Sequence, residues 1–129
     1  MIQESDTQHT IREFTDLIVW QKGHKLVLAI YLITKKFPRE EIFGLTSQMR
    51  RSAVSITSNI AEGFGRKGFK EKIQFYYLAQ GSLTELRNQL ILSRDVGYFD
   101  TKIFTNLETS LVEVHRLLQG LITKSKTFL

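Results

Sequence analysis

Residues 45–68 read LTSQMRRSAVSITSNIAEGFGRKG, and the spacing of the apolar side chains in this stretch decides the fold. From Leu45 to Phe64 they recur at steps of four, four, three, four and four residues, which is the period of one face of an α-helix. Thr46 is the predicted N-cap of this helix. The apolar positions are Leu45, Met49, Ala53, Ile56, Ile60 and Phe64, and the glycines that end the helix are Gly63, Gly65 and Gly68.

The helical period continues on both sides of this stretch. The first of the flanking helices starts with Thr15 or Asp16 as its N-cap and stops before Pro38, because proline lacks a backbone N–H. Asp100 is the predicted N-cap of the last helix. The predicted helices cover residues 16–36, 45–64, 69–95 and 101–124. Short connections make neighbouring helices antiparallel, so the sequence predicts an all-α, up-and-down four-helix bundle.

Length and composition agree with one domain of this kind. The chain has 129 residues, which suits a single domain, and we expect residues 14–129 to form it after a mobile tail at 1–13. One proline and 8 glycines are too few for the many turns of an all-β fold, and the absence of cysteine excludes disulfides. No apolar run approaches the ~20 residues of a membrane span. We therefore expect a cytoplasmic protein without a membrane partner.

The charge is distributed unevenly along the chain. The whole sequence carries +5, but residues 1–16 carry −3, which leaves +8 for residues 17–129. A strongly basic domain favours polyanionic partners such as RNA or DNA, although basic residues also serve solubility alone.

The densest basic region is the predicted turn between the second and third helices and its flanks. Residues 63–68 have the spacing G-x-G-x-x-G, but a helix precedes them, which excludes the dinucleotide-binding motif because that motif follows a strand. The glycines and the start of the third helix could still hold phosphate. The alternative is a solvated hairpin whose glycines merely end a helix. The predicted nucleic-acid-binding residues are Arg50, Arg51, Arg66, Lys67, Lys70 and Lys72.

A polar stripe accompanies the apolar face of the second helix. Its members are Gln48, Arg51, Ser55, Asn59 and Glu62, spaced three or four residues apart. We interpret Gln48, Ser55, Asn59 and Glu62 as a structural network that fixes helix register, in preference to a catalytic site. Glu62 is expected to pair across helices with Lys22, Lys25 or Arg87.

The apolar arcs of three helices are wider than a single bundle needs. Leu26, Leu28 and Ile33 broaden the arc of the first helix. A second apolar side indicates burial against another subunit or a partner, although isolated surface hydrophobes are also normal. The predicted interface residues of a homo-oligomer are Val54, Ala61, Tyr77, Leu78 and Leu92. Among the neighbouring aromatics, Tyr76 is expected in the core and Tyr77 on the surface.

Catalytic and metal-binding patterns are sparse. The chain has no cysteine and only three histidines, and no Glu-x-x-His pair precedes His115. The sequence therefore predicts no enzyme activity, no catalytic residues, no metal, no cofactor and no small-molecule substrate.

An ordered set of segments resembles a known family. These segments are 14–17 (FTDL), 19–22 (VWQK), 37–38 (FP), 44–51 (GLTSQMRR), 59–63 (NIAEG), 65–66 (GR), 79–86 (AQGSLTEL) and 97–98 (GY). They are similar to the small four-helix-bundle proteins encoded by intervening sequences of bacterial 23S ribosomal RNA genes, from about Phe14 to Ile122. They are also similar to the accessory variability protein of diversity-generating retroelements.

The resemblance implies a ring-like homopentamer with a basic surface that binds nucleic acid. Arg50, Arg51 and Arg66 occupy the family's basic positions. Gly23 departs from the pattern, where alanine is expected, and would allow a close helix contact.

Two functions follow from the sequence and the resemblance together. The first is a non-enzymatic oligomer that binds RNA or DNA, in a ribosomal RNA intervening-sequence or retroelement-like context. The alternative is a protein–protein interaction or scaffold module without a nucleic-acid role.

Overall fold

The computed structural model describes residues 10–129, and this part of the chain is helical with no strand. Residues 1–9 of the predicted tail lie outside the described residues. In chain order the elements are η1 (Phe14–Asp16), α2 (Ile18–Thr34), η2 (Arg39–Glu41), α3 (Leu45–Phe64), α4 (Phe69–Asp95) and α5 (Thr101–Lys126). None of the helices in the described range is long and apolar enough to cross a membrane.

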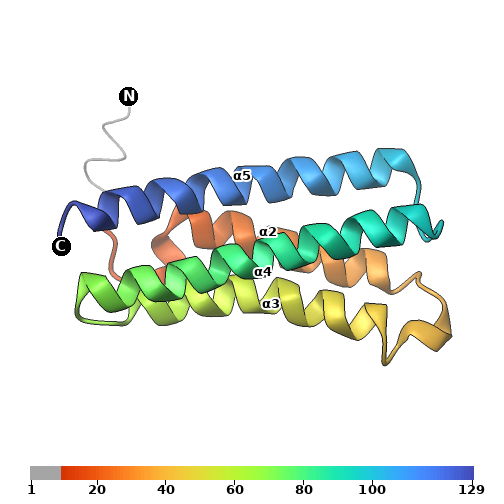
Figure 1. The fold of residues 1–129 in the computed structure, drawn as a ribbon, viewed down its shortest axis with the longest axis horizontal. Coiled ribbons are helices and arrows are strands. Elements are labelled where there is room, and N and C mark those ends of the chain that lie inside the picture. Colours follow the sequence, from red (N-terminus) through yellow and green to blue (C-terminus); the bar gives the residue numbers. More distant parts are fainter. Residues whose placement is uncertain (1–9) are drawn as a thin grey trace.

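The four α-helices lie side by side along the long axis of the molecule (Figure 1). Helix α3 packs against α2 and α4, and α5 packs against α4 and α2, whereas the diagonal pairs within residues 10–129 do not pack on each other. Short connections reverse the chain between successive helices, so this is the predicted antiparallel four-helix bundle.

The core fills the space between the four helices. Tyr76 is only 2% exposed and Tyr77 is 44% exposed, which confirms the predicted placement of both rings. The largest fully buried aliphatic side chains are Leu26, Ile30, Met49, Ile56, Ile60, Leu83, Leu86, Leu90, Val114, Leu118 and Ile122.

Helix α2 faces the core with a side that includes Leu26. This residue was expected to broaden the apolar arc toward another subunit or a partner, but its side chain is 1% exposed and lies in the core. Gly23 is buried on the same side of the helix. A Cβ atom there would lie 3.1 Å from Cγ2 of Thr57, so the missing side chain lets α2 lie close to α3. The close contact expected at Gly23 is confirmed.

One of the three predicted N-caps is confirmed. Asp100 Oδ1 accepts a hydrogen bond from the Ile103 N–H at 2.9 Å, as a capping side chain does. The predictions of Thr15 or Asp16 and of Thr46 as N-caps are wrong. Leu17 is the N-cap of α2, because the Asp16 carboxylate accepts hydrogen bonds from the backbone N–H groups of Arg12 and Glu13 instead.

At the start of α3 the side chain of Glu41, four residues before Leu45, replaces the predicted cap. Gly44 is the N-cap, and Glu41 Oε1 accepts a hydrogen bond from the Leu45 N–H at 3.0 Å. Thr46 lies inside the helix and is buried. Helix α2 also ends at Thr34, two residues earlier than predicted, because the N–H of Phe37 bonds to the Thr34 carbonyl in a tighter turn.

Candidate nucleic-acid interface

The hairpin between α3 and α4 places the glycine motif at one end of the bundle (Figure 1). The prediction that Gly63 ends α3 is wrong, because Gly63 lies within the last turn of the helix and packs against α4. A Cβ atom on Gly63 would lie 2.7 Å from Cε1 of Tyr76, so this glycine permits a close helix contact. Gly65 is the C-cap and Gly68 the N-cap of the next helix. Helix packing and helix termination therefore account for the G-x-G-x-x-G spacing.

Two of the hairpin cations are held by neighbouring groups. Arg66 pairs with Glu62 at 2.7 Å, and its guanidinium lies 4.7 Å from the ring centre of Phe75. Lys72 Nζ donates a hydrogen bond to the Phe64 carbonyl at 2.6 Å. Partial burial lowers the pKa of Lys72 because it disfavours the charged form.

The other two hairpin cations are free to contact a ligand. Lys67 and Lys70 are exposed, and neither forms an ion pair with any of residues 10–129. Both lysines lie next to the start of α4, where the helix dipole favours anions. The N-cap, Gly68, has no side chain to bond the N–H groups at this helix start.

The C-terminal end of α5 brings two lysines that the sequence analysis did not identify. Phe128 stacks on Phe69 with ring centres 4.7 Å apart, and Lys126 Nζ lies 5.4 Å from the ring centre of Tyr77. These contacts place Lys126 against α4 and bring the last turn of α5, which also carries Lys124, to the same end of the bundle as the hairpin. The up-and-down topology could have revealed them, because the fourth helix must end where the second ends. We call Arg66, Lys67, Lys70, Lys72, Lys124 and Lys126 the basic end.

The predicted basic set is not brought together as one site. Arg50 lies 14 residues before Phe64, the last residue of α3, which corresponds to about 21 Å at ~1.5 Å per residue, and Arg66 follows the end of the helix. Arg50 instead donates from Nε to Thr34 Oγ1 at 2.9 Å, and Arg51 is exposed beside it. Only the four hairpin cations of the predicted set belong to the basic end.

The polar stripe divides into a bonded part and a solvated part. Ser82 Oγ donates to Ser55 Oγ at 2.8 Å, which joins α4 to α3, and Asn59 Nδ2 donates to the Ser55 carbonyl at 2.8 Å. Gln48 is exposed. Glu62 is exposed as well and pairs with Arg66 of its own hairpin.

The prediction that Glu62 pairs across helices is wrong. Lys22 lies 3.8 Å from Glu113 and Arg87 lies 2.8 Å from Glu108, so both cations pair with α5. They cannot serve Glu62 because they point away from α3.

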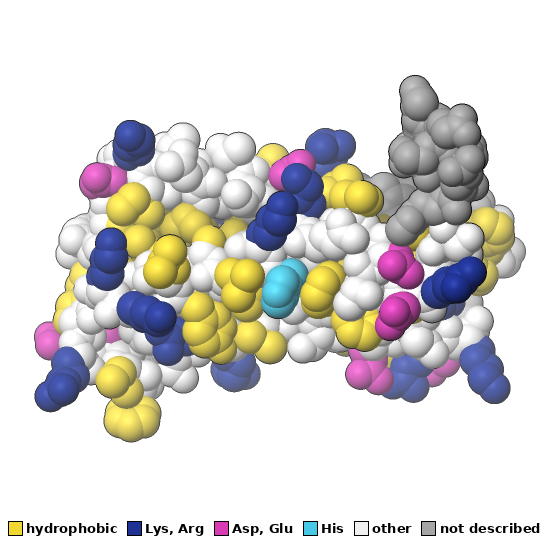
Figure 2. Space-filling model, turned by 180° about the vertical axis from the view of Figure 1, so that it is seen from behind, with side chains coloured by type: hydrophobic (Ala, Val, Ile, Leu, Met, Phe, Trp, Pro, Cys, Tyr) yellow, Lys and Arg dark blue, Asp and Glu magenta, His cyan; other side chains and the backbone are white. Residues whose placement is uncertain are grey.

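The predicted interface residues are largely on the surface. Val54, Tyr77, Leu78 and Leu92 are between 38% and 56% exposed, and Ala61 is half-buried. Val54 and Ala61 share one face of α3, and Leu78 and Leu92 share one face of α4, because each spacing is a whole number of turns. Tyr77 is turned away from Leu78 and lies under Lys126. Figure 2 shows further hydrophobic side chains in a band along the back of the molecule.

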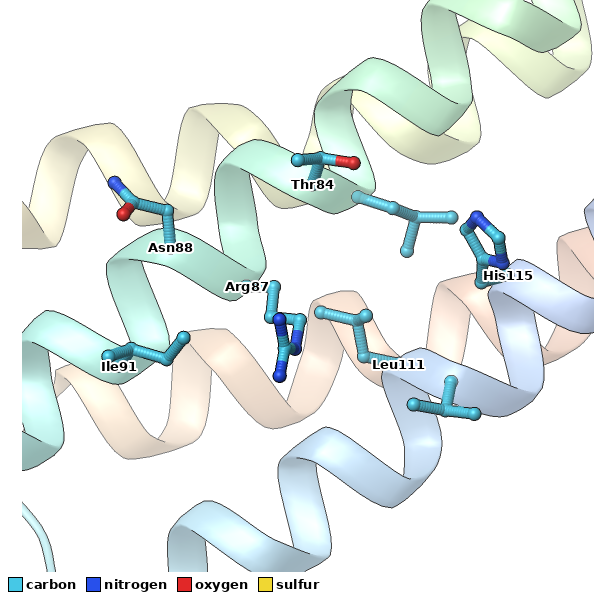
Figure 3. Close-up of a pocket in the computed structure, with 8 residues that line it drawn as sticks. Thr84, Arg87, Asn88, Ile91, Leu111 and His115 are labelled. Atoms are coloured by element: carbon cyan, nitrogen blue, oxygen red, sulfur yellow. The ribbon is translucent and has the colours of Figure 1, made fainter.

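An apolar groove of about 390 Å³ lies between α4 and α5 (Figure 3). It offers no catalytic constellation, because Arg87 is paired with Glu108 and the lining contains no carboxylate beside its histidine. Residues 10–129 contain no group of three or more histidine, cysteine, aspartate or glutamate side chains that could hold a metal. The lining residues are Leu83, Thr84, Arg87, Asn88, Ile91, Leu111, Val112 and His115.

The fold and the basic end define an all-α four-helix-bundle protein with a cluster of cations at the end that carries the α3–α4 hairpin. The family model for the 23S rRNA-intervening sequence protein matches residues 15–120, and the chain belongs to this family. A protein of unknown function from the S23 ribosomal protein family of Bacteroides thetaiotaomicron has a similar crystal structure. It is 22% identical, has a TM-score of 0.76, and the match covers 81% of this chain and 98% of that one.

No curated protein matches the chain. The resemblance to the accessory variability protein of retroelements stays a prediction.

Proposed function

We propose that this protein is a non-enzymatic homo-oligomer that binds RNA or DNA through its basic end. The observation that carries the proposal is the meeting of the α3–α4 hairpin with the end of α5. This meeting brings six cationic side chains to one end of the bundle (Figure 1), where the carboxylates are Glu62 and Glu71 of the hairpin and Glu13 and Asp16 at η1. Membership of the 23S rRNA-intervening sequence protein family supports a ribosomal RNA context.

The chemistry of the basic end suits the phosphate backbone better than base edges. Lys67 and Lys70 are flexible, exposed point charges, which contact phosphates without reading sequence. Arg66 can exchange the exposed Glu62 for a phosphate at small cost, because exposed ion pairs are weak. Binding should therefore depend little on sequence and strongly on salt.

Assembly would multiply a weak site. The exposed apolar residues on α3 and α4 support burial against further copies, and the family resemblance implies a ring of five. Repeating the basic end around a ring raises affinity by avidity, without new contacts in each subunit. The alternative scaffold role has no comparable support in the structure.

The first prediction concerns the two free lysines. Lys67→Gln/Lys70→Gln should weaken binding of a structured ribosomal RNA fragment, because each phosphate contact releases counterions. The slope of log K against log salt should become shallower by roughly 1.5 per contacting subunit. Fluorescence anisotropy across a potassium chloride series measures both the affinity and the slope.

The matched control is Lys25→Gln/Lys102→Gln, which removes the same charge at exposed positions outside the basic end. It should leave the slope close to that of the unmodified protein. Equal weakening by the two double variants would show that binding follows net charge and not the basic end. A duplex DNA of equal length, measured in parallel, separates RNA from DNA preference.

A further inference from the structure

A cationic pocket lies at the opposite end of the bundle from the basic end. It has a volume of about 290 Å³ and sits between the end of α2, η2 and the first turns of α3. Three of the lining residues are cations and none is a carboxylate. The lining residues are Thr34, Lys35, Phe37, Pro38, Arg39, Ile42, Thr46 and Arg50.

Arg50 is fixed in place by a buried side chain. Thr34 is 3% exposed, and its hydroxyl donates to the Ile30 carbonyl at 2.7 Å while it accepts from Arg50 Nε at 2.9 Å. Nη2 of Arg50 reaches the Tyr31 carbonyl at 3.4 Å, and the guanidinium lies 4.7 Å from the centre of the Tyr31 ring. Nη1 has no partner among residues 10–129, so its two N–H groups remain available to a ligand.

Thr46 adds a hydroxyl group to the lining of the pocket. The residue is 5% exposed, and its hydroxyl, which makes no hydrogen bond within residues 10–129, remains accessible to solvent in the pocket. Thr46 also lies in the first turn of α3, where the helix dipole favours an anion.

Neither carboxylate of η2, Glu40 or Glu41, lines the pocket. Glu41 Oε1 accepts from the Leu45 N–H, and Glu41 Oε2 accepts from the Tyr98 hydroxyl at 2.6 Å. Lys35 and Arg39 form no ion pair with residues 10–129. The cations of this pocket are therefore not neutralised by the protein.

We propose that this pocket binds a phosphoryl group. A phosphate monoester carries two negative charges and accepts hydrogen bonds, which complements a lining of three cations and an unpaired hydroxyl. Arg50 offers the N–H groups of Nη1 on a fixed guanidinium, Lys35 and Arg39 offer charge, and Thr46 offers a hydroxyl donor. At about 290 Å³ the pocket suits a phosphoryl group with a small substituent. The site is separate from the basic end and does not depend on the function proposed there.

Calorimetry with inorganic phosphate and adenosine monophosphate tests the proposal on the full chain. We expect saturable binding to the unmodified protein and at least tenfold weaker binding to Lys35→Gln/Arg39→Gln. The variant Lys67→Gln/Lys70→Gln should bind phosphate normally, which distinguishes this site from the basic end. Absence of binding to the unmodified protein, or equal binding to Lys35→Gln/Arg39→Gln, would overturn the proposal.

A near-isosteric variant tests the pocket without the loss of folding that larger changes can cause. Thr46→Val removes this hydroxyl and should leave the free protein folded while weakening phosphate binding severalfold. Unchanged phosphate affinity in Thr46→Val would contradict the donor role of this hydroxyl.

Two short oligonucleotides of the same sequence, one with a 5′-phosphate and one with a 5′-hydroxyl, show whether the phosphoryl group comes from a nucleic acid or from a small molecule. If the group is a nucleic-acid terminus, the 5′-phosphorylated strand binds more tightly than the 5′-hydroxyl strand, and Lys35→Gln/Arg39→Gln abolishes the difference. If the source is a small phosphorylated molecule, the two strands bind equally while adenosine monophosphate still binds. Both results support the pocket, and they identify its ligand.

Discussion

Single glycines set how closely the helices of this bundle approach one another. Gly23 brings α2 against Thr57 of α3, and Gly63 brings the last turn of α3 against Tyr76 of α4. Neither glycine has a positive φ angle. Among the described residues, Gly97 is the one with a positive φ angle. Their role is therefore space and not backbone freedom.

Gly63→Ala should destabilise the fold by about 1–2 kcal/mol, because overpacking outweighs the gain in helix propensity. The new Cβ atom would lie 2.7 Å from Cε1 of the buried Tyr76 ring, which has no room to move. Urea denaturation measures the change. Gly120→Ala is the control, since its Cβ atom would meet nothing within 4 Å, and it should stabilise α5 by about 0.5–1 kcal/mol. A stabilised Gly63→Ala protein would refute the close-contact role.

At the scale of the elements, one carboxylate ties two connections together. Glu41 accepts one hydrogen bond from the start of α3 and one from Tyr98 in the α4–α5 connection. The Tyr98 hydroxyl and, to a lesser extent, the Leu45 N–H lower the pKa of Glu41, because both stabilise its ionised form. The hydrogen bond to Glu41 in turn raises the pKa of Tyr98. The pair fixes the end of the bundle that carries the phosphoryl pocket.

The contribution of Glu41 to stability should depend on pH. A lowered pKa in the folded state adds stability above the unfolded value of about 4.5, and this stability is lost as the pH falls through the folded value. Tyr98→Phe removes the larger cause of the shift. Its deficit in unfolding free energy should therefore be greatest near neutral pH and shrink at about pH 3.

Urea denaturation at the two pH values checks this expectation. Tyr31→Phe is the control, since the Tyr31 hydroxyl has no partner in the described chain, and its effect should not change with pH. A Tyr98→Phe deficit that is the same at both pH values would contradict the link to Glu41.

At the scale of the whole molecule, apolar side chains remain exposed on α3 and α4. Val54 marks the face on α3 and Leu78 the face on α4, and both side chains are exposed. Apolar side chains repeated at whole helical turns on neighbouring helices suit burial between identical copies. These two faces are the basis of the proposed ring.

We expect a homo-oligomer in solution, with a mass of about 75 kDa for five copies of a 15.0 kDa chain. Val54→Asp and Leu78→Asp should each lower the molar mass, because a buried carboxylate without a partner is costly. Size-exclusion chromatography with light scattering measures the molar mass. Val112→Asp, at an equally exposed position on α5, should leave the mass unchanged. A monomeric unmodified protein would rule out the ring.

The periodic segments of the sequence were sufficient to predict the helices. The apolar spacing gave α4 its observed bounds, and Asp100 was recognised as a cap because its partner lies three residues away. The capping role of Glu41 was missed because Glu41 lies before the usual N-cap position, although only four residues separate it from Leu45. The Tyr98 hydroxyl that bonds the other Glu41 oxygen lies 57 residues further along the chain, and so distant a partner cannot be read from residue spacing.

The sequence by itself determined the four amphipathic helices, their order and the excess of positive charge, because these follow from residue spacing and composition. Only the tertiary structure decided which charges meet. It added Lys124 and Lys126 to the hairpin lysines and moved Arg50 to a pocket at the other end of the bundle. The physical reason is that each helix, at 17 to 27 residues, runs the length of the bundle, so residues near its two ends lie at opposite ends of the molecule.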